Sequence, residues 1–204
     1  MFQQLATLGG LMLATAALTM TAPAPTSTTQ AEGAFTVDGV HSSVVFHTIH
    51  SGAARFYGTF DSISGSIEFD EKHPDKASVK ISIDATSVDS NNSKRDQHLS
   101  GPDFINAKEF PTITFESKKV KVAKKAKGDD PMMLEVIGEL NFVGKKRDIT
   151  AMVEHVGSGK GMGGSEIHGF EARFDISRAE FGIDTVPGLG DKIGLIVSVE
   201  AGRR

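Results

Sequence analysis

The sequence contains no cysteine and no tryptophan, and Tyr57 is its single tyrosine. Without cysteine the chain can form no disulfide bond, thiolate zinc site, cysteine-held cluster or cysteine nucleophile, and no lipid can be attached through a thiol. Basic residues are not in excess either, because the net charge is −4 and the pI is near 6.0, so we expect no nucleic-acid partner. The 24% of charged and 39% of hydrophobic residues exclude disordered and collagen-like classes.

The N-terminal segment lacks charge altogether, since residues 1–31 contain no Asp, Glu, Lys or Arg. Leu8 to Met20 is an apolar run whose helix would be roughly 20 Å long, shorter than a bilayer core of about 30 Å. Small residues follow it, although the first four residues lack the usual basic side chain. The pattern predicts a signal peptide and linker over 1–31, and hence a periplasmic or secreted protein, with a retained anchor as the alternative. Candidate cleavage positions are Ala22, Ala24 and Ala31.

Beyond residue 34 the hydrophobicity repeatedly alternates with a period of two. In the segment 78–85, for example, Val79, Ile81 and Ile83 are apolar and the residues between them are polar. Such one-faced alternation indicates antiparallel strands with one side in water. Eight of these strands can remove both sheet edges by closing into a barrel, which holds either packed side chains or one slender ligand. We therefore predict one all-β domain over 32–204, a single closed antiparallel eight-stranded barrel with strands at 43–50, 63–70, 78–85, 112–122, 133–143, 148–156, 168–176 and 193–200.

Residues 90–110 interrupt the alternation and predict one or two short helices within 91–108. Ser90 or Asn91 is the candidate N-cap, and Gly101-Pro102 would restart the chain at a first-turn position. Apolar residues in this segment would pack it over a barrel mouth or flank.

Two sequence patterns resemble binding motifs without their structural context. Residues 159–164 match G-x-G-x-x-G, but they join two alternating strands instead of opening a helix, and so predict a hairpin tip. Lysines cluster between 118 and 127, but acidic residues follow directly and no aromatic residue is interleaved to stack bases. The lysines are therefore interpreted as the solvated face of a hairpin protected by charge.

Two polar clusters could reach a ligand. His41 and His47 would share one face of an extended strand while His50 lies on the other, so a metal site there would need partners from neighbouring strands, and we predict none. Arg95, Asp96 and His98 lie together in the helical interruption. Their role is either mutual pairing that holds the helix over the barrel or a grip on a polar head group.

Several blocks of the chain together resemble the YceI-like family. They include Phe35-Thr36-Val37-Asp38 with HSSVVFHTIHSG, the segment IDATSVDSNNSKRDQHLSGPDFINAKEFPTITFES, GFEARFDISRAEFGID and the final GDKIGLIVSVEA. The resemblance covers about 35–202. It implies a lipocalin-like antiparallel barrel exported to the bacterial periplasm or beyond, with a long apolar cavity for polyisoprenoid or other lipid chains. Ile105, Thr48 and Asn141-Phe142-Val143 depart from the family pattern and affect the shape of the cavity.

Inward faces of this composition suit a hydrocarbon and offer few groups for acid–base chemistry. We therefore expect an exported lipid-binding protein for transport, storage or stress protection, with no catalytic residue, no metal and no cofactor. The membrane would serve only as the source of the ligand, and a homodimer is left open. The predicted head-group contacts are His50, Arg95 and His98, and the predicted cavity wall consists of Val44, Phe46, Ile67, Phe69, Val79, Ile81, Ile83, Ile113, Phe115, Leu140, Phe142, Phe170, Phe174 and Leu195.

Two other function classes remain open from the sequence. One is a secreted enzyme that acts on an apolar small molecule, which would require titratable groups with shifted pKa values inside the cavity. The other is a structural or stress protein with a filled barrel, which would have no cavity.

Overall fold

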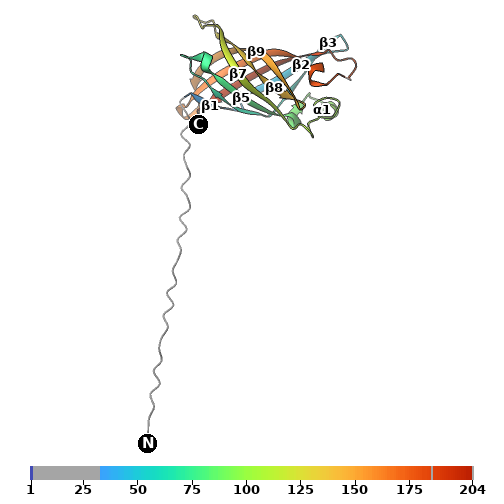
Figure 1. The fold of residues 1–204 in the computed structure, drawn as a ribbon, viewed down its shortest axis with the longest axis horizontal. Coiled ribbons are helices and arrows are strands. Elements are labelled where there is room, and N and C mark those ends of the chain that lie inside the picture. The colour runs from blue at the N-terminus through green and yellow to red at the C-terminus, as the bar shows by residue number, and fades with distance from the viewer. Residues whose placement is uncertain (2–32, 185, 204) are drawn as a thin grey trace.

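The structure is a computed structural model that describes Met1, residues 33–184 and residues 186–203 (Figure 1). The predicted signal peptide, its linker and its cleavage positions therefore lie outside the described residues. Among the described residues, no helix is long and apolar enough to cross a membrane.

One sheet contains every described strand, and all its pairings are antiparallel. The strands are β1 (Ala34–Val37), β2 (Ser43–His50), β3 (Ala54–Phe60), β4 (Ile63–Glu68), β5 (Ser78–Asp84), β6 (Val88–Asp89), β7 (Thr112–Lys124), β8 (Met132–Phe142), β9 (Lys145–Lys160), β10 (Glu166–Ser177) and β11 (Lys192–Gly202). The helical segments are α1 (Ser93–Leu99) and the short 3-10 turns η1 (Pro74–Lys76), η2 (Ala85–Ser87), η3 (Met162–Gly164) and η4 (Ala179–Phe181).

The sheet closes into a barrel because β11 pairs with β1, with Thr36 opposite Gly202. The closed ring has the strand order β1-β4-β5-β7-β8-β9-β10-β11, which confirms the predicted eight-stranded antiparallel barrel. Each of the eight predicted segments overlaps a strand, but the segment 43–50 is not the ring member that closes the barrel. That strand is β1, which the alternation did not predict because it is only four residues long.

At three places around the barrel, one strand position is filled by two shorter strands with a break between them. The strand β2 continues β1 along β11, with Val44 opposite Val197, after a break at residues 38–42. In the same way β3 continues β4, and β6 continues β5 beyond η2. At the packed end of the barrel, β1, β4 and β5 complete the ring through backbone hydrogen bonds.

At the other end, here called the cavity end, the interrupted strands diverge from the ring. Among the described strands β6 pairs with β3 alone, so no backbone hydrogen bonds join it to β7. The gap is covered by side chains that follow β6, since Leu99, Phe104 and Ile105 pack against the core. Figure 1 shows α1 and β3 at this end of the barrel, and β1 and the C-terminus at the opposite end.

The predicted helical interruption contains one α-helix, α1, followed by turns up to residue 110. Its N-cap is Asn92, whose Oδ1 accepts the backbone N–H of Arg95 at 3.1 Å. The predicted caps Ser90 and Asn91 are therefore wrong, because Ser90 is used to bond the side chains of Arg95 and Asp96. Gly101-Pro102 begins a turn and not a second helix.

The two sequence patterns without functional context behave as predicted. The glycine-rich segment 159–164 connects β9 to β10 at a hairpin tip that includes η3. The lysines of the β7–β8 hairpin form ion pairs across the sheet surface, with Lys118 Nζ 2.6 Å from Asp148 and Lys124 Nζ 2.8 Å from Asp130.

Candidate functional site

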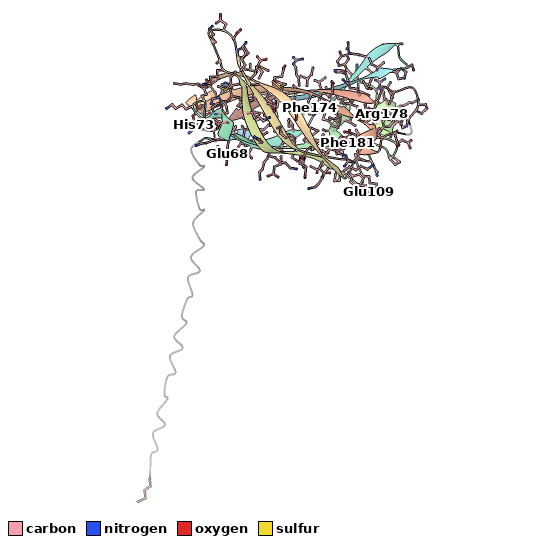
Figure 2. The ribbon with its side chains drawn as sticks, turned by 45° about the horizontal axis from the view of Figure 1, so that its top comes forward. Glu68, His73, Glu109, Phe174, Arg178 and Phe181 are labelled. Carbon is pink, nitrogen blue, oxygen red and sulfur yellow. The ribbon has the colours of Figure 1, made fainter. Side chains whose placement is uncertain are left out.

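The cavity end contains a cavity of about 530 Å³. It lies where the ring is not closed by backbone pairing, between α1, the β2–β3 hairpin and the residues that follow η4, of which 183, 184 and 186–190 are described and are here called the segment 183–190. In Figure 2, Arg178 and Phe181 lie toward this end of the barrel, and Phe174 lies nearer its middle. The wall is formed almost entirely by apolar side chains, and the described residues that line it include no carboxylate.

A second, much smaller space of about 70 Å³ lies toward the packed end and is entirely apolar. The two spaces share the side chain of Val197. The barrel interior therefore consists of a wide half that can take a ligand and a narrow half that is nearly filled by side chains.

The predicted wall residues divide between these two spaces. The 530 Å³ cavity is lined by Val44, Phe46, Ile83, Ile113, Leu140, Phe142, Phe174 and Leu195. The narrow space is lined by Ile67, Phe69, Val79, Ile81, Phe115 and Phe170. The alternation thus predicted inward orientation correctly for the whole set, but it could not show that the interior is divided.

The three predicted head-group contacts all line the cavity. Arg95 projects from α1, and its guanidinium lies 4.5 Å from the centre of the Phe56 ring. Its Nε and Nη2 donate hydrogen bonds to the hydroxyl and the carbonyl of Ser90, at 2.9 and 2.5 Å. The geometry therefore shows that Arg95 holds α1 against the barrel, which was one of its two predicted roles.

His98 and His50 line the cavity from different elements. The ring of His98 packs edge-on against Phe104, with its Nε2 3.4 Å from a carboxylate oxygen of Asp103. His50 is the last residue of β2, and its backbone is bridged to Leu189. The part of the wall formed by α1, the end of β2 and the segment 183–190 is here called the mouth.

Arg178 organises that segment and was not predicted from the sequence. Its guanidinium donates hydrogen bonds to four backbone carbonyls, those of Ile183, Val186, Leu189 and Gly190. The segment is tied to β2 as well, because the amide of Gly190 donates to the carbonyl of Ile49 at 2.8 Å. Nothing in the alternation marks Arg178, since it follows the last residue of β10.

Thr48 is the polar exception on the inward face of β2. Its hydroxyl is 3.2 Å from the carbonyl of Gly190 and 3.1 Å from that of Lys192. The buried hydroxyl of Thr48 is therefore satisfied, and it links β2 to the start of β11 and to the residue two positions before it.

The other predicted histidines lie away from the cavity. The exposed ring of His41 is 2.9 Å from a carboxylate oxygen of Asp38, and this hydrogen bond raises the pKa of His41 and lowers the pKa of Asp38. His47 packs against Tyr57 with ring centres 5.3 Å apart. The three histidines 41, 47 and 50 are thus not brought together.

Glycines let two aromatic rings lie flat along the inner wall. A Cβ on Gly58 would stand 2.3 Å from Phe46 Cζ, and a Cβ on Gly138 would stand 2.4 Å from Phe115 Cζ. Phe46 lines the cavity and Phe115 lines the narrow space. A glycine inside a strand often marks a close approach of another group, and at Gly138 that group is a ring of the protein itself.

Known proteins resemble this chain in sequence and in fold. A model of the YceI-like domain matches residues 35–201. Protein YceI of Escherichia coli is 37% identical over 164 residues, which are 80% of this chain and 82% of that protein. The chain belongs to the YceI-like family. Protein YceI of Salmonella arizonae is 36% identical over the same shares of both chains.

Solved structures show the same barrel. The Campylobacter jejuni YceI protein has a TM-score of 0.66 and 29% identity, covering 74% of this chain and 86% of that one. A polyisoprenoid binding domain from Saccharophagus degradans has a TM-score of 0.64 and covers 83% of this chain and 98% of that one. At 11% identity the second likeness shows the fold alone. Both agree with the closed antiparallel ring described above.

Proposed function

We propose that this YceI-like protein is exported and holds a polyisoprenoid, or a similar long apolar chain, in the cavity of about 530 Å³. The observation that carries the proposal is the apolar wall of this cavity, at the one end of the barrel where side chains and not backbone pairs close the ring. The polyisoprenoid binding domain of the same fold supports this class of ligand. The charge-free apolar segment near the N-terminus supports export.

The size and polarity of the cavity agree with a hydrocarbon ligand. Small-molecule pockets in proteins are roughly 300 to 1,000 Å³. Burying hydrocarbon contributes about 0.8 kcal/mol per CH₂, so ten buried carbons supply roughly 8 kcal/mol. Association costs roughly 4 to 15 kcal/mol, so that burial of about twenty carbons, worth roughly 16 kcal/mol, offsets even the upper figure.

The charged groups on the cavity wall favour a polar or anionic head group. They are all basic or imidazole side chains, namely His50, Arg55, Arg95, His98 and Arg178. Arg178 donates to four backbone carbonyls of one segment. Arg95 and His98 come from α1, where Arg95 also donates to Ser90 and His98 lies 3.4 Å from Asp103. An anionic head at the mouth would therefore meet positive charge and would face no carboxylate of the described wall.

The same features weigh against the two alternatives from the sequence. A filled barrel would leave no space of this size, and the cavity therefore disfavours a purely structural role. An enzyme would need an acid and a base held close together on the wall, and no hydrogen bond or ion pair joins the two histidines of the described wall, His50 and His98, to each other.

The direct test is mass spectrometry of organic extracts from the natively purified protein. We expect a co-purified long-chain lipid from the wild type, and its loss from Ile83→Trp, which fills the cavity from β5. If the wild type carries no lipid and takes up no polyprenol or polyprenyl phosphate when offered either, the binding proposal is overturned. N-terminal sequencing of protein recovered from the periplasm or medium tests export, and we expect it to begin between residues 23 and 35.

A comparison of two ligands separates the head-group role of Arg95 from its role in holding α1. We expect Arg95→Ala to weaken polyprenyl phosphate binding while leaving neutral polyprenol binding close to the wild type. Lys125→Ala removes an exposed charge far from the mouth and should change neither. Equal weakening of both ligands by Arg95→Ala would show that the arginine acts only by positioning the helix.

A further inference from the structure

The packed end of the barrel contains a buried pair of histidines that the lipid-binding proposal does not use. His155 lies on β9 and His168 on β10, and their side chains are 9% and 3% exposed. Nε2 of His155 is 3.0 Å from Nδ1 of His168. The rings of Phe69 and Phe170 pack around both imidazoles, with ring centres 4.9 to 6.2 Å apart.

His168 has a hydrogen-bond partner on the side of its ring that faces away from His155. Its Nε2 is 3.2 Å from Oε1 of Glu166, and the other oxygen of this carboxylate forms an ion pair with Arg203, 3.0 Å from its Nε.

The two nitrogens that face each other, Nε2 of His155 and Nδ1 of His168, are 3.0 Å apart and form the hydrogen bond between the rings. Each neutral imidazole has one N–H group and one lone pair. When the donating ring carries its hydrogen on its other nitrogen instead, both facing nitrogens present lone pairs that can bind a metal ion.

The carboxylate of Glu71 lies near the two nitrogens that face each other. Oε1 of Glu71, in the segment between β4 and η1, is 3.9 Å from Nε2 of His155 and 3.9 Å from Nδ1 of His168. Zinc–nitrogen bonds of about 2.0–2.1 Å in a tetrahedral site place two ligand atoms roughly 3.3 Å apart. The separations of 3.0 and 3.9 Å lie on either side of this value. Glu71 is half exposed, so its side chain can adjust and leaves a route from solvent.

We propose that Nε2 of His155, Nδ1 of His168 and the carboxylate of Glu71 form a site for a divalent transition-metal ion, with Zn²⁺ as its best match. Two imidazoles and one carboxylate are a common donor set for zinc, which leaves a fourth position for water. The outer partner Glu166 is of the kind that orients metal-bound histidines in proteins, a carboxylate at the ring nitrogen of His168 that would not bind the metal. None of the three residues lines the lipid cavity, and the site does not depend on the proposed function.

The exposed group Asp38, His41 and Glu200 provides an internal contrast. Its ligand atoms are also close enough together to meet a cation. His41 is 64% exposed, however, and its Nδ1 is already hydrogen-bonded to Asp38. A group of this kind on the surface is common without an ion, and His41→Ala therefore serves as the matched control.

A metal ion at the proposed site would tie three parts of the packed end together. It would join the segment after β4 to the neighbouring strands β9 and β10, next to the pairing that closes the barrel. We therefore expect Zn²⁺ to raise the thermal unfolding temperature, because a ligand that binds only the folded state stabilises it.

The test is Zn²⁺ titration of the tag-free protein, followed by calorimetry and by ¹⁵N NMR of the imidazoles. We expect one Zn²⁺ per chain, with shifts confined to Nε2 of His155 and Nδ1 of His168. Glu71→Gln should weaken binding, and Glu166→Gln should weaken it roughly ten- to a hundred-fold, the usual effect of removing an outer partner. His41→Ala should bind as the wild type does.

Three results would overturn the proposal. They are no Zn²⁺ binding at micromolar to millimolar concentrations, unchanged binding in His155→Gln and His168→Gln, and NMR shifts at His41 in place of the buried pair. Glu71 is half exposed, so Glu71→Gln keeps the test valid if the histidine variants fail to fold. A wild-type spectrum that shows a proton shared between the two rings and no response to Zn²⁺ would show that the pair is a structural hydrogen bond.

Discussion

The two ends of the barrel are built from the same strands but enclose very different volumes. The cavity end holds about 530 Å³ of space and the packed end about 70 Å³, although apolar side chains line both. Both ends also contain a phenylalanine ring lying over a glycine, Phe46 over Gly58 and Phe115 over Gly138. Residue type alone therefore does not decide which end is hollow.

The difference arises from how the ring is closed. At the packed end, β1 pairs with both β4 and β11, so backbone hydrogen bonds fix the distance between opposite walls. At the cavity end, β6 is an edge strand among those described, and α1 with the turns after it takes the place of a pairing strand. Side chains from Leu99, Phe104 and Ile105 cover the opening without filling it. Breaks at three strand positions thus leave a cavity at one end of the barrel, while the other end stays packed.

Alanine substitution at the two glycines should have unequal effects, and it is the strongest test of this comparison. In Gly138→Ala the new Cβ would meet Phe115 Cζ at 2.4 Å and the Glu116 carbonyl oxygen at 2.5 Å, next to a space too small to receive the ring. We expect a loss of about 3 kcal/mol in the free energy of unfolding, at the upper end of overpacking costs. Urea denaturation measures it.

Gly58→Ala is the matched variant at the cavity end. Its Cβ would meet Phe46 Cζ at 2.3 Å, but this ring borders open space into which it can turn. We expect a loss of about 1 kcal/mol, together with weaker lipid uptake because the ring then occupies the cavity. Equal destabilisation by the two variants would contradict the view that only the cavity end has room to adjust.

Arg178→Met should loosen the cavity end while leaving the packed end intact. It removes the donors to four backbone carbonyls of the segment 183–190, and unsatisfied partners of a charged donor cost about 2 kcal/mol. Hydrogen exchange should rise in this segment and not in β9 or β4. The control is Arg173→Met, an exposed residue of β10 that pairs with Glu171 and should cost less than about 0.5 kcal/mol.

Two isoleucines on β5 provide a finer test, since they lie two residues apart and are both half-buried. Ile83 lines the cavity and Ile81 lines the narrow space. Ile81→Phe should destabilise the protein by about 1–2 kcal/mol through overpacking. Ile83→Phe should leave the stability nearly unchanged and weaken lipid binding roughly ten-fold, which corresponds to about 1.4 kcal/mol of lost contact. A fall in lipid binding with Ile81→Phe would show that the ligand extends into the narrow space.

The alternation of the sequence was sufficient to predict the barrel but not its interruptions. In β3 the inward positions are Phe56, Gly58 and Phe60, and Tyr57 points outward, so the apolar pattern is obscured by a glycine on one face and an aromatic residue on the other. The breaks that separate β1 from β2 and β5 from β6 have no comparable signal, because they depend on pairing with distant strands.

The sequence was sufficient to predict which side chains point into the barrel, but not which other residues take part in the site. Arg178 was missed because its partners are backbone carbonyls of a loop. Every residue has such a carbonyl, so the sequence does not single out these partners. The pair His155 and His168 had a signal, since each continues the apolar phase of its strand, after Val153 and before Phe170. Their contact also depends on the register shift between Gly169 and Phe170, which places Phe170 opposite His155, and on Glu71 from a distant loop. Such long-range geometry cannot be predicted from one sequence.

The smallest expected effect concerns the break between β1 and β2, where His41 and Asp38 form an exposed pair. The hydrogen bond from His41, the largest cause, lowers the pKa of Asp38, and the same bond raises the pKa of His41. The contribution of His41 to stability is therefore fully present below its unfolded pKa of about 6.5, and is lost as pH rises through its raised folded pKa. The contribution of Asp38 is present above about pH 3.9 and is lost as pH falls through its lowered folded pKa.

His41→Ala should consequently lower the unfolding temperature slightly at pH 5 and not at pH 9, and salt should shrink the difference because the pair is exposed to solvent. A larger difference at pH 9 than at pH 5 would show that His41 stabilises the break by packing and not by its charge.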